Sequence, residues 1–196
     1  MPSASPSTRV LLIADEASIV DTIQSELNTD YEFEALGTGK PTDDAPLPIQ
    51  DHDIVVIYQT VLEQSDLAKI EQSIAITPIP VLVFVQSDPY RMARAAIRSG
   101  VTSFVVDGFD VGRISTLIDV TMERFKLSEG LRNELLKSQE ELAARKTIER
   151  AKGLLMDKKQ LNEQEAYRAL RELAMRQSKP IKEVAETLLV YSDLLP

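Results

Sequence analysis

The chain has 196 residues, of which 43% are hydrophobic and 27% charged, a composition typical of folded globular proteins. It contains no cysteine and a single histidine, His52, which excludes disulfides, cysteine nucleophiles and metal sites built from several histidines. The formal net charge of −9 argues against non-specific nucleic-acid binding by the chain as a whole. We therefore expect neither a metal nor a cofactor, and the absence of cysteine fits the cytoplasm.

The N-terminal two thirds of the chain show the pattern of an α/β domain. Residues 1–8 have no apolar stretch behind a basic start, so we expect a short disordered tail rather than a signal sequence. Apolar runs predict strands, in chain order, in RVLLIADEAS, YEFEAL, DIVVIY, IPVLVFV and TSFVVDG. Helical periodicity appears in SIVDTIQSELN and in PYRMARAAIRSG, and GTGKPTDDAPLP is predicted as a loop. This alternation indicates a flavodoxin-like (βα)5 domain over residues 9–126, with a parallel sheet covered on both faces.

From Val111 onward the sequence is predicted to continue as one long helix. An imperfect apolar stripe runs along it, made of Ile118, Met122, Phe125, Leu131, Leu135 and Leu142. The stretch Glu134–Arg145 is too polar to be buried inside one chain, which favours a coiled-coil homodimer through residues 118–145, with 127–148 as the linker helix. The alternative is a single amphipathic helix packed on its own domain.

The last residues, 145–196, predict a three-helix module whose first helix is the end of the long one. Asn162 is expected to cap the second helix in a capping box with Glu165, and Ser178 to cap the third. Between Arg145 and Lys182 there are 11 lysines and arginines against 5 acidic residues, so this module is basic whereas the rest is acidic. The asymmetry suggests a module that binds a polyanion. A hairpin with a solvated charged surface is the alternative.

Over about residues 8–126 the chain resembles the receiver domain of response regulators, with its functional positions altered. The positions that would carry phosphorylation in that family are occupied here by Ala14, Asp15, Tyr58, Val85 and Asp107. Phosphorylation needs carboxylates for Mg²⁺, an aspartate nucleophile and a lysine that offsets the phosphoryl charge. Tyr58 replaces the nucleophile and Asp107 the lysine, so the resemblance implies a pseudo-receiver without catalytic residues that acts through protein contacts.

The C-terminal module resembles the ANTAR domain of AmiR/NasR-type regulators. The motifs AKGLLM and EAYRALRELAM carry this resemblance, which extends over Arg145–Leu189, and VVDG at Val105–Gly108 and the segment MERF are similar to the NasT-like branch. The resemblance implies an RNA-binding transcription antiterminator that binds tandem stem-loops in a leader transcript. It also implies control by a ligand-sensing partner, a NasS-like nitrate/nitrite sensor or, in the AmiR-like alternative, an amide sensor.

The candidates for RNA contact are the basic side chains of the module and one aromatic side chain that could stack on an unpaired base. They are Lys146, Arg150, Lys152, Lys158, Lys159, Tyr167, Arg168, Arg171, Arg176 and Lys179. Removal of Lys152 and Arg171 together is expected to weaken RNA binding without unfolding the protein. His52 is expected to be a lone exposed histidine. A protein-binding adaptor and a DNA-binding regulator remain alternatives, and an enzyme is disfavoured because no complete catalytic set is present.

Overall fold

The computed structural model describes residues 8–27, 31–36, 46–88 and 92–194. Most of the predicted N-terminal tail, and the loop residues 37–45, lie outside this description. The chain divides into two compact units, residues 1–129 and 130–196, which are described separately below. Among the described residues, no helix combines the length and the apolar character that crossing a membrane requires.

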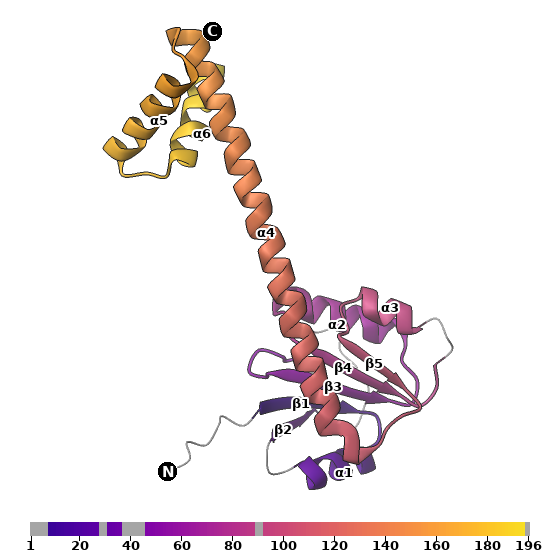
Figure 1. Ribbon diagram of the computed structural model, residues 1–196. Coiled ribbons are helices and arrows are strands. Elements are labelled where there is room, and N and C mark those ends of the chain that lie inside the picture. The colour runs from indigo at the N-terminus through magenta and orange to yellow at the C-terminus, as the bar shows by residue number, and fades with distance from the viewer. Residues whose placement is uncertain (1–7, 28–30, 37–45, 89–91, 195–196) are drawn as a thin grey trace, which may run out of the picture. The chain divides into compact units, whose positions relative to one another are not determined.

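The first unit is built on a parallel five-stranded sheet. Its strands are β1 (Thr8–Ala14), β2 (Tyr31–Leu36), β3 (Ile54–Gln59), β4 (Val81–Val85) and β5 (Ser103–Val106). They lie in the order β2-β1-β3-β4-β5, the doubly wound order that the sequence predicts (Figure 1). Every residue of the inner strands β3 and β4 is buried, because helices cover both faces. In the edge strand β2, exposed and half-buried residues alternate over most of its length.

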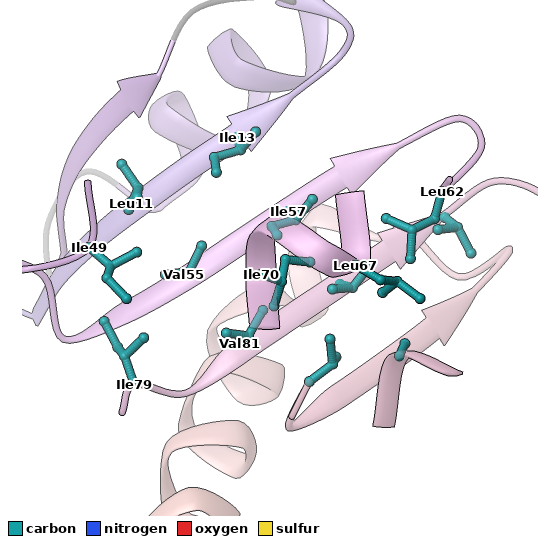
Figure 2. Close-up of a cluster of buried hydrophobic side chains, with 14 residues drawn as sticks. Leu11, Ile13, Ile49, Val55, Ile57, Leu62, Leu67, Ile70, Ile79 and Val81 are labelled. Atoms are coloured by element: carbon teal, nitrogen blue, oxygen red, sulfur yellow. The ribbon is translucent and has the colours of Figure 1, made fainter. Parts of the chain in front are cut away.

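Two hydrophobic cores hold the helices against the sheet. On one face, α2 (Gln64–Ile76) and α3 (Met92–Arg98) contribute Leu67, Ile70 and Ala96 to the first core. Figure 2 shows Leu67 and Ile70 beside strand residues such as Ile57. On the other face, α1 (Ala17–Leu27) and the start of α4 (Ile114–Lys159) complete the second core. The sheet is therefore covered on both faces, as predicted.

Three local features differ from the prediction or extend it. Helix α2 is not among the predicted elements, although its apolar residues Leu67, Ile70 and Ile74 have helical spacing. The predicted helix from Val111 begins as a 3₁₀ turn, Val111–Arg113, capped by Asp110, whose Oδ1 accepts a hydrogen bond from the Gly112 amide at 3.1 Å. His52 is not exposed: its side chain is 6% accessible, and its Nε2 lies 3.2 Å from Glu34 Oε2. The prediction was wrong because the partner comes from β2, a neighbour only in the fold.

The second unit contains the end of α4, followed by α5 (Glu163–Gln177) and α6 (Ile181–Leu194). Its small core is formed by Ala151, Leu155, Ala166, Leu170 and Ala185. The predicted capping box is present: Asn162 Oδ1 accepts from the Glu165 amide, and Glu165 Oε2 accepts from the Asn162 amide, both at 2.9 Å.

Ser178 does not cap α6 as predicted. It ends α5 in the left-handed conformation, with φ 52°, and its amide donates to the last turn of α5. The chain needs this reversal of direction before α6 can begin at Ile181, so the residue serves the end of one helix rather than the start of the next.

Candidate nucleic-acid interface

The five predicted positions of the degenerate phosphorylation site do meet in space. Ala14 pairs with Tyr58 in the sheet, and the Asp15 amide donates to the Tyr58 carbonyl at 3.3 Å. The Asp107 amide donates to the Val85 carbonyl at 3.0 Å. All five therefore lie at the carboxyl edge of the parallel strands, where α/β domains form their sites. An open cleft of about 520 Å³ is lined there by Tyr58, Val85 and Asp107, among others.

The Tyr58 side chain belongs to the core rather than to the cleft chemistry. The residue is only 2% exposed, and its ring packs edge-on against Phe109 with the centroids 5.0 Å apart. Phe109 in turn packs against Phe84 at 5.6 Å. Burial raises the pKa of the Tyr58 phenol above 10.0, a hydrogen bond from Gln86 opposes the shift, and the nearby carboxylates of Glu16 and Asp15 add to it. Tyr58 is thus neutral at physiological pH and offers no anionic nucleophile.

The two acidic positions of this edge differ in their surroundings. Asp15 Oδ2 accepts a hydrogen bond from the Thr60 amide at 2.6 Å, and its Oδ1 is buried without a partner among the described residues. Asp107 is exposed and has a left-handed backbone with φ 44°. Asp107 thus presents a carboxylate at this edge of the sheet, which disfavours a bound phosphoryl group.

In the second unit, nine of the ten predicted RNA-contact residues are exposed. Those nine are Lys146, Arg150, Lys158, Lys159, Tyr167, Arg168, Arg171, Arg176 and Lys179. Lys158 and Lys159 occupy the last turn of α4, where positive charge also complements the helix dipole. Arg176 lies in the last turn of α5 in the same way, so these three residues have a structural reason to be basic besides any contact with RNA.

Lys152 is the exception, because it is 7% exposed. Its ammonium group donates to Glu163 Oε1 at 2.7 Å and to both carboxylate oxygens of Glu149 at about 3 Å. These hydrogen bonds, that of Glu163 foremost, raise the pKa of Lys152 above 10.5, and the same contact lowers the pKa of Glu163 below 4.5. Lys152 thus ties α4 to the first turn of α5, so its removal would test the fold as well as RNA contact.

The outer face of α5 carries two of the exposed arginines. Gln164, Arg168, Arg171 and Met175 recur at intervals of four, three and four residues, which places them on one helical face. All four are exposed, and Met175 reaches 71%. Ala166 and Leu170 lie on the opposite face, in the core. Two arginines with an amide and a flexible apolar side chain offer both phosphate contacts and contacts to unstacked bases. Sequence reasoning had not singled out Gln164 and Met175, although their spacing was visible.

The outer face of α6 differs in sign. Glu183 and Glu186 are exposed there, and Lys182 lies 3.9 Å from Glu186 in an ion pair that spans one turn. Positive charge in this unit is therefore distributed over the end of α4, over α5 and over the Ser178 turn that follows it. A polyanion would be attracted to those elements rather than to α6.

The middle of α4 exposes a row of leucines. Leu127, Leu131, Leu135 and Leu142 are each more than half exposed. Closer to the N-terminus of α4, Ile118 is fully buried in the second hydrophobic core of the first unit, and Met122 packs against that core. The predicted apolar stripe thus has two parts, of which only the later part is free to contact another molecule.

The chain is similar to a known domain family and to a known regulatory protein. Residues 137–189 match the family model of the ANTAR domain, so the second unit carries an ANTAR domain. The chain is 29% identical over 186 residues to the transcriptional regulatory protein PdtaR of Mycobacterium tuberculosis, in strains CDC 1551 / Oshkosh and ATCC 25618 / H37Rv. The match covers 92% of this chain and 89% of the relative, so the two proteins are homologous over nearly their whole lengths.

Solved structures match the first unit. The CheY-like response regulator receiver domain protein of Methanospirillum hungatei JF-1 aligns with a TM-score of 0.50 and 12% identity, over 62% of this chain and 98% of that one. A receiver domain protein of Clostridium thermocellum gives a TM-score of 0.50 and 19% identity, over 61% and 98%. At these identities the likeness establishes the receiver-like fold and nothing about phosphorylation.

Proposed function

We propose that the protein is an RNA-binding transcription antiterminator whose C-terminal helices bind stem-loops in a leader transcript. The observation that carries this proposal is the ANTAR domain at residues 137–189, with exposed arginines and lysines on α4 and α5. Phosphate contacts from these cations would supply salt-dependent affinity, and contacts to unpaired loop bases would supply specificity. Homology to a transcriptional regulatory protein supports a regulatory rather than an enzymatic role.

In this proposal the chain has three functional segments. Residues 9–126 form the pseudo-receiver, 127–148 the linker helix and 145–196 the RNA-binding domain. We place the protein in the cytoplasm, where nascent transcripts are accessible in bacteria.

The protein would bind RNA as a homodimer. The exposed leucines of α4 support this, because a second copy of the same helix would remove their side chains from water. The contact is narrower than the predicted segment 118–145, since Ile118 lies in the core of its own unit. Two ANTAR domains held on one dimer would bind two tandem stem-loops together, which raises affinity through effective concentration.

Control would come from a partner protein rather than from phosphorylation. The buried neutral Tyr58 and the carboxylate at Asp107 support this, because neither supplies the chemistry of an acyl phosphate. On the resemblance of Val105–Gly108 to the NasT-like branch, the partner would be a NasS-like nitrate/nitrite sensor, and the regulated genes those of nitrate/nitrite assimilation. An AmiR-like amide sensor is the alternative, and co-purification with each class of sensor distinguishes them.

A filter-binding titration tests the proposed function directly. The protein is titrated against a tandem stem-loop RNA and against duplex DNA, each at two salt concentrations. We expect selective retention of RNA, with affinity that falls as salt rises. Equal retention of duplex DNA would favour a DNA-binding regulator. Retention of neither would favour an adaptor whose basic helices contact an acidic protein.

A further inference from the structure

Two glycines, Gly130 and Gly153, lie at exposed positions inside the continuous helix α4. Glycine inside a helix lowers the stability of the helix relative to alanine, so each needs a physical reason. Neither has a positive φ, and a Cβ atom built on either would meet no atom within 4 Å outside its own helix backbone. Neither backbone geometry nor packing within the described chain therefore requires glycine at these two positions.

The surroundings of Gly153 distinguish it from Gly130. Lys146, Arg150, Gly153 and Asp157 recur at intervals of four, three and four residues, so they share one face of α4. All four are exposed, whereas Ala151 on the other side is fully buried in the core of the module. The missing side chain at Gly153 thus leaves the helix backbone accessible next to two cations.

The charges on this face favour a polyanion. Within the part of the chain that the structure describes, neither Lys146 nor Arg150 pairs with a carboxylate. Glu149, the acid that lies between these two cations in the sequence, is already bound to the Lys152 ammonium at 2.9 Å. Asp157 is the one opposing charge on the face. A protein helix packed here would have to desolvate both cations, which is unfavourable without matching acids.

We propose that the α4 face centred on Gly153 is where the RNA sugar–phosphate backbone comes closest to the protein. Lys146 and Arg150, two turns and one turn before the glycine, contact phosphates. The absent side chain lets the nucleic acid approach the helix backbone, a use of glycine seen where a backbone must lie close to a ligand. This inference rests on the proposed RNA-binding function and adds to it a second surface besides the outer face of α5.

The test compares the two glycines with each other. Gly153→Ala and Gly153→Gln are measured for thermal unfolding and for binding to the tandem stem-loop RNA. Both should raise the melting temperature or leave it unchanged, because each residue favours a helix more than glycine does. The affinity should nevertheless fall, by about tenfold for the glutamine variant and by less for alanine. Loss of binding in a protein that is no less stable cannot arise from unfolding.

Gly130→Ala and Gly130→Gln are the matched controls, since they make the same changes in the same helix. They should raise the melting temperature similarly and leave RNA affinity unchanged. Wild-type binding with undiminished binding by both Gly153 variants would overturn the inference and leave the proposed function standing. Dissociation of a dimer by the Gly153 variants, with unchanged RNA affinity per protomer, would also overturn it and assign the face to a second copy. A wild-type protein that binds no RNA would remove both.

Discussion

The carboxyl edge of the sheet and the outer surface of the ANTAR module use their polar positions in opposite ways. At the sheet edge, Tyr58 is buried and packs against Phe109. In the module, a core of mostly small residues is surrounded by arginines and lysines that have few partners. The sheet edge therefore uses Tyr58 for packing, whereas most cations of the module are exposed to solvent.

This contrast indicates where regulation and binding reside. The burial of Tyr58 beside Phe109 leaves no ionised nucleophile at this position, which supports the proposal that the first unit acts through contacts of its surface. Most cations of the module are exposed and solvated, which supports the proposal that the module binds a charged ligand. Substitutions at the sheet edge and in the module should therefore have different effects, and the largest is expected at the sheet edge.

The largest effect is expected from Tyr58→Asp, which restores the residue type that a receiver would use. The carboxylate would replace a buried ring, so we expect a loss of about 3–5 kcal/mol in the free energy of unfolding, as for other large aromatic deletions in cores. The variant should still form no acyl phosphate with acetyl phosphate, because Asp107 stands where the lysine is needed. Urea unfolding and phosphate incorporation measure the two outcomes.

Tyr58→Phe is the control for this change. It keeps the ring contacts with Phe109 and removes only the phenol, so its effect on unfolding should be below about 1.5 kcal/mol. A Tyr58→Asp protein as stable as the wild type would show that the edge is not a packed core. Stable phosphorylation of that variant would show that the site is only one substitution away from function.

The strands were predictable because their pattern of apolar residues is local in the sequence, whereas a residue that contacts a distant segment gives no such local signal. A strand buried on both faces needs an apolar residue at every position, so Val81–Val85 is recognisable without knowledge of its neighbours. The edge strand β2 is recognisable by its alternation. The prediction for His52 was wrong because its ion-pair partner, Glu34, comes from another strand, and α2 was not predicted although Leu67, Ile70 and Ile74 have helical spacing.

The sequence predicts which residues of the candidate site are basic, but it does not predict which of their side chains are exposed. Lys152 looked like any other module cation, yet its ammonium is bound by Glu163, eleven residues away on the next helix. A signal did exist: helical periodicity places position 152 beside the apolar positions 148, 151 and 155. Charge content thus identified the module, whereas the division into displayed and paired cations required the packing of α4 against α5.

The second prediction concerns the exposed leucines that would join two modules. Leu131→Lys combined with Leu135→Lys should convert a dimer into monomers, measured by analytical ultracentrifugation. Affinity for a tandem stem-loop RNA should fall by about a hundredfold, the lower range of gains from linked binding, and affinity for one stem-loop should stay unchanged. Leu136→Lys is the control, since Leu136 lies away from the stripe. Loss of dimerisation in this control, or monomers in the wild type, would contradict the proposed contact.

The third prediction examines the outer face of α5. Arg168→Ala combined with Arg171→Ala should weaken RNA binding by about tenfold and reduce the slope of log affinity against log salt by about 1.4–1.8, the value for two phosphate contacts. Arg94→Ala combined with Arg98→Ala removes the same charge from α3 of the first unit and should change neither quantity. Equal losses in the two double variants would mean that overall charge, rather than this face, governs binding.

The smallest effect is expected from the pH dependence of the Lys152–Glu163 pair. The pKa of Glu163 is lowered in the folded protein, so its stabilising contribution is present above 4.5 and is lost as pH falls through the lowered value. The pKa of Lys152 is raised, so its contribution is present below 10.5 and is lost as pH rises through the raised value. Hydrogen exchange of the α5 amides, compared between variants at each pH, should therefore show that Glu163→Gln reduces the loss of stability at acid pH.

Glu186→Gln is the control. Its partner Lys182 is 3.9 Å away and both side chains are well exposed, an arrangement that contributes little. If both variants reduce the loss of stability at acid pH equally, general surface charge, and not the contact between α4 and α5, sets the acid stability of the module.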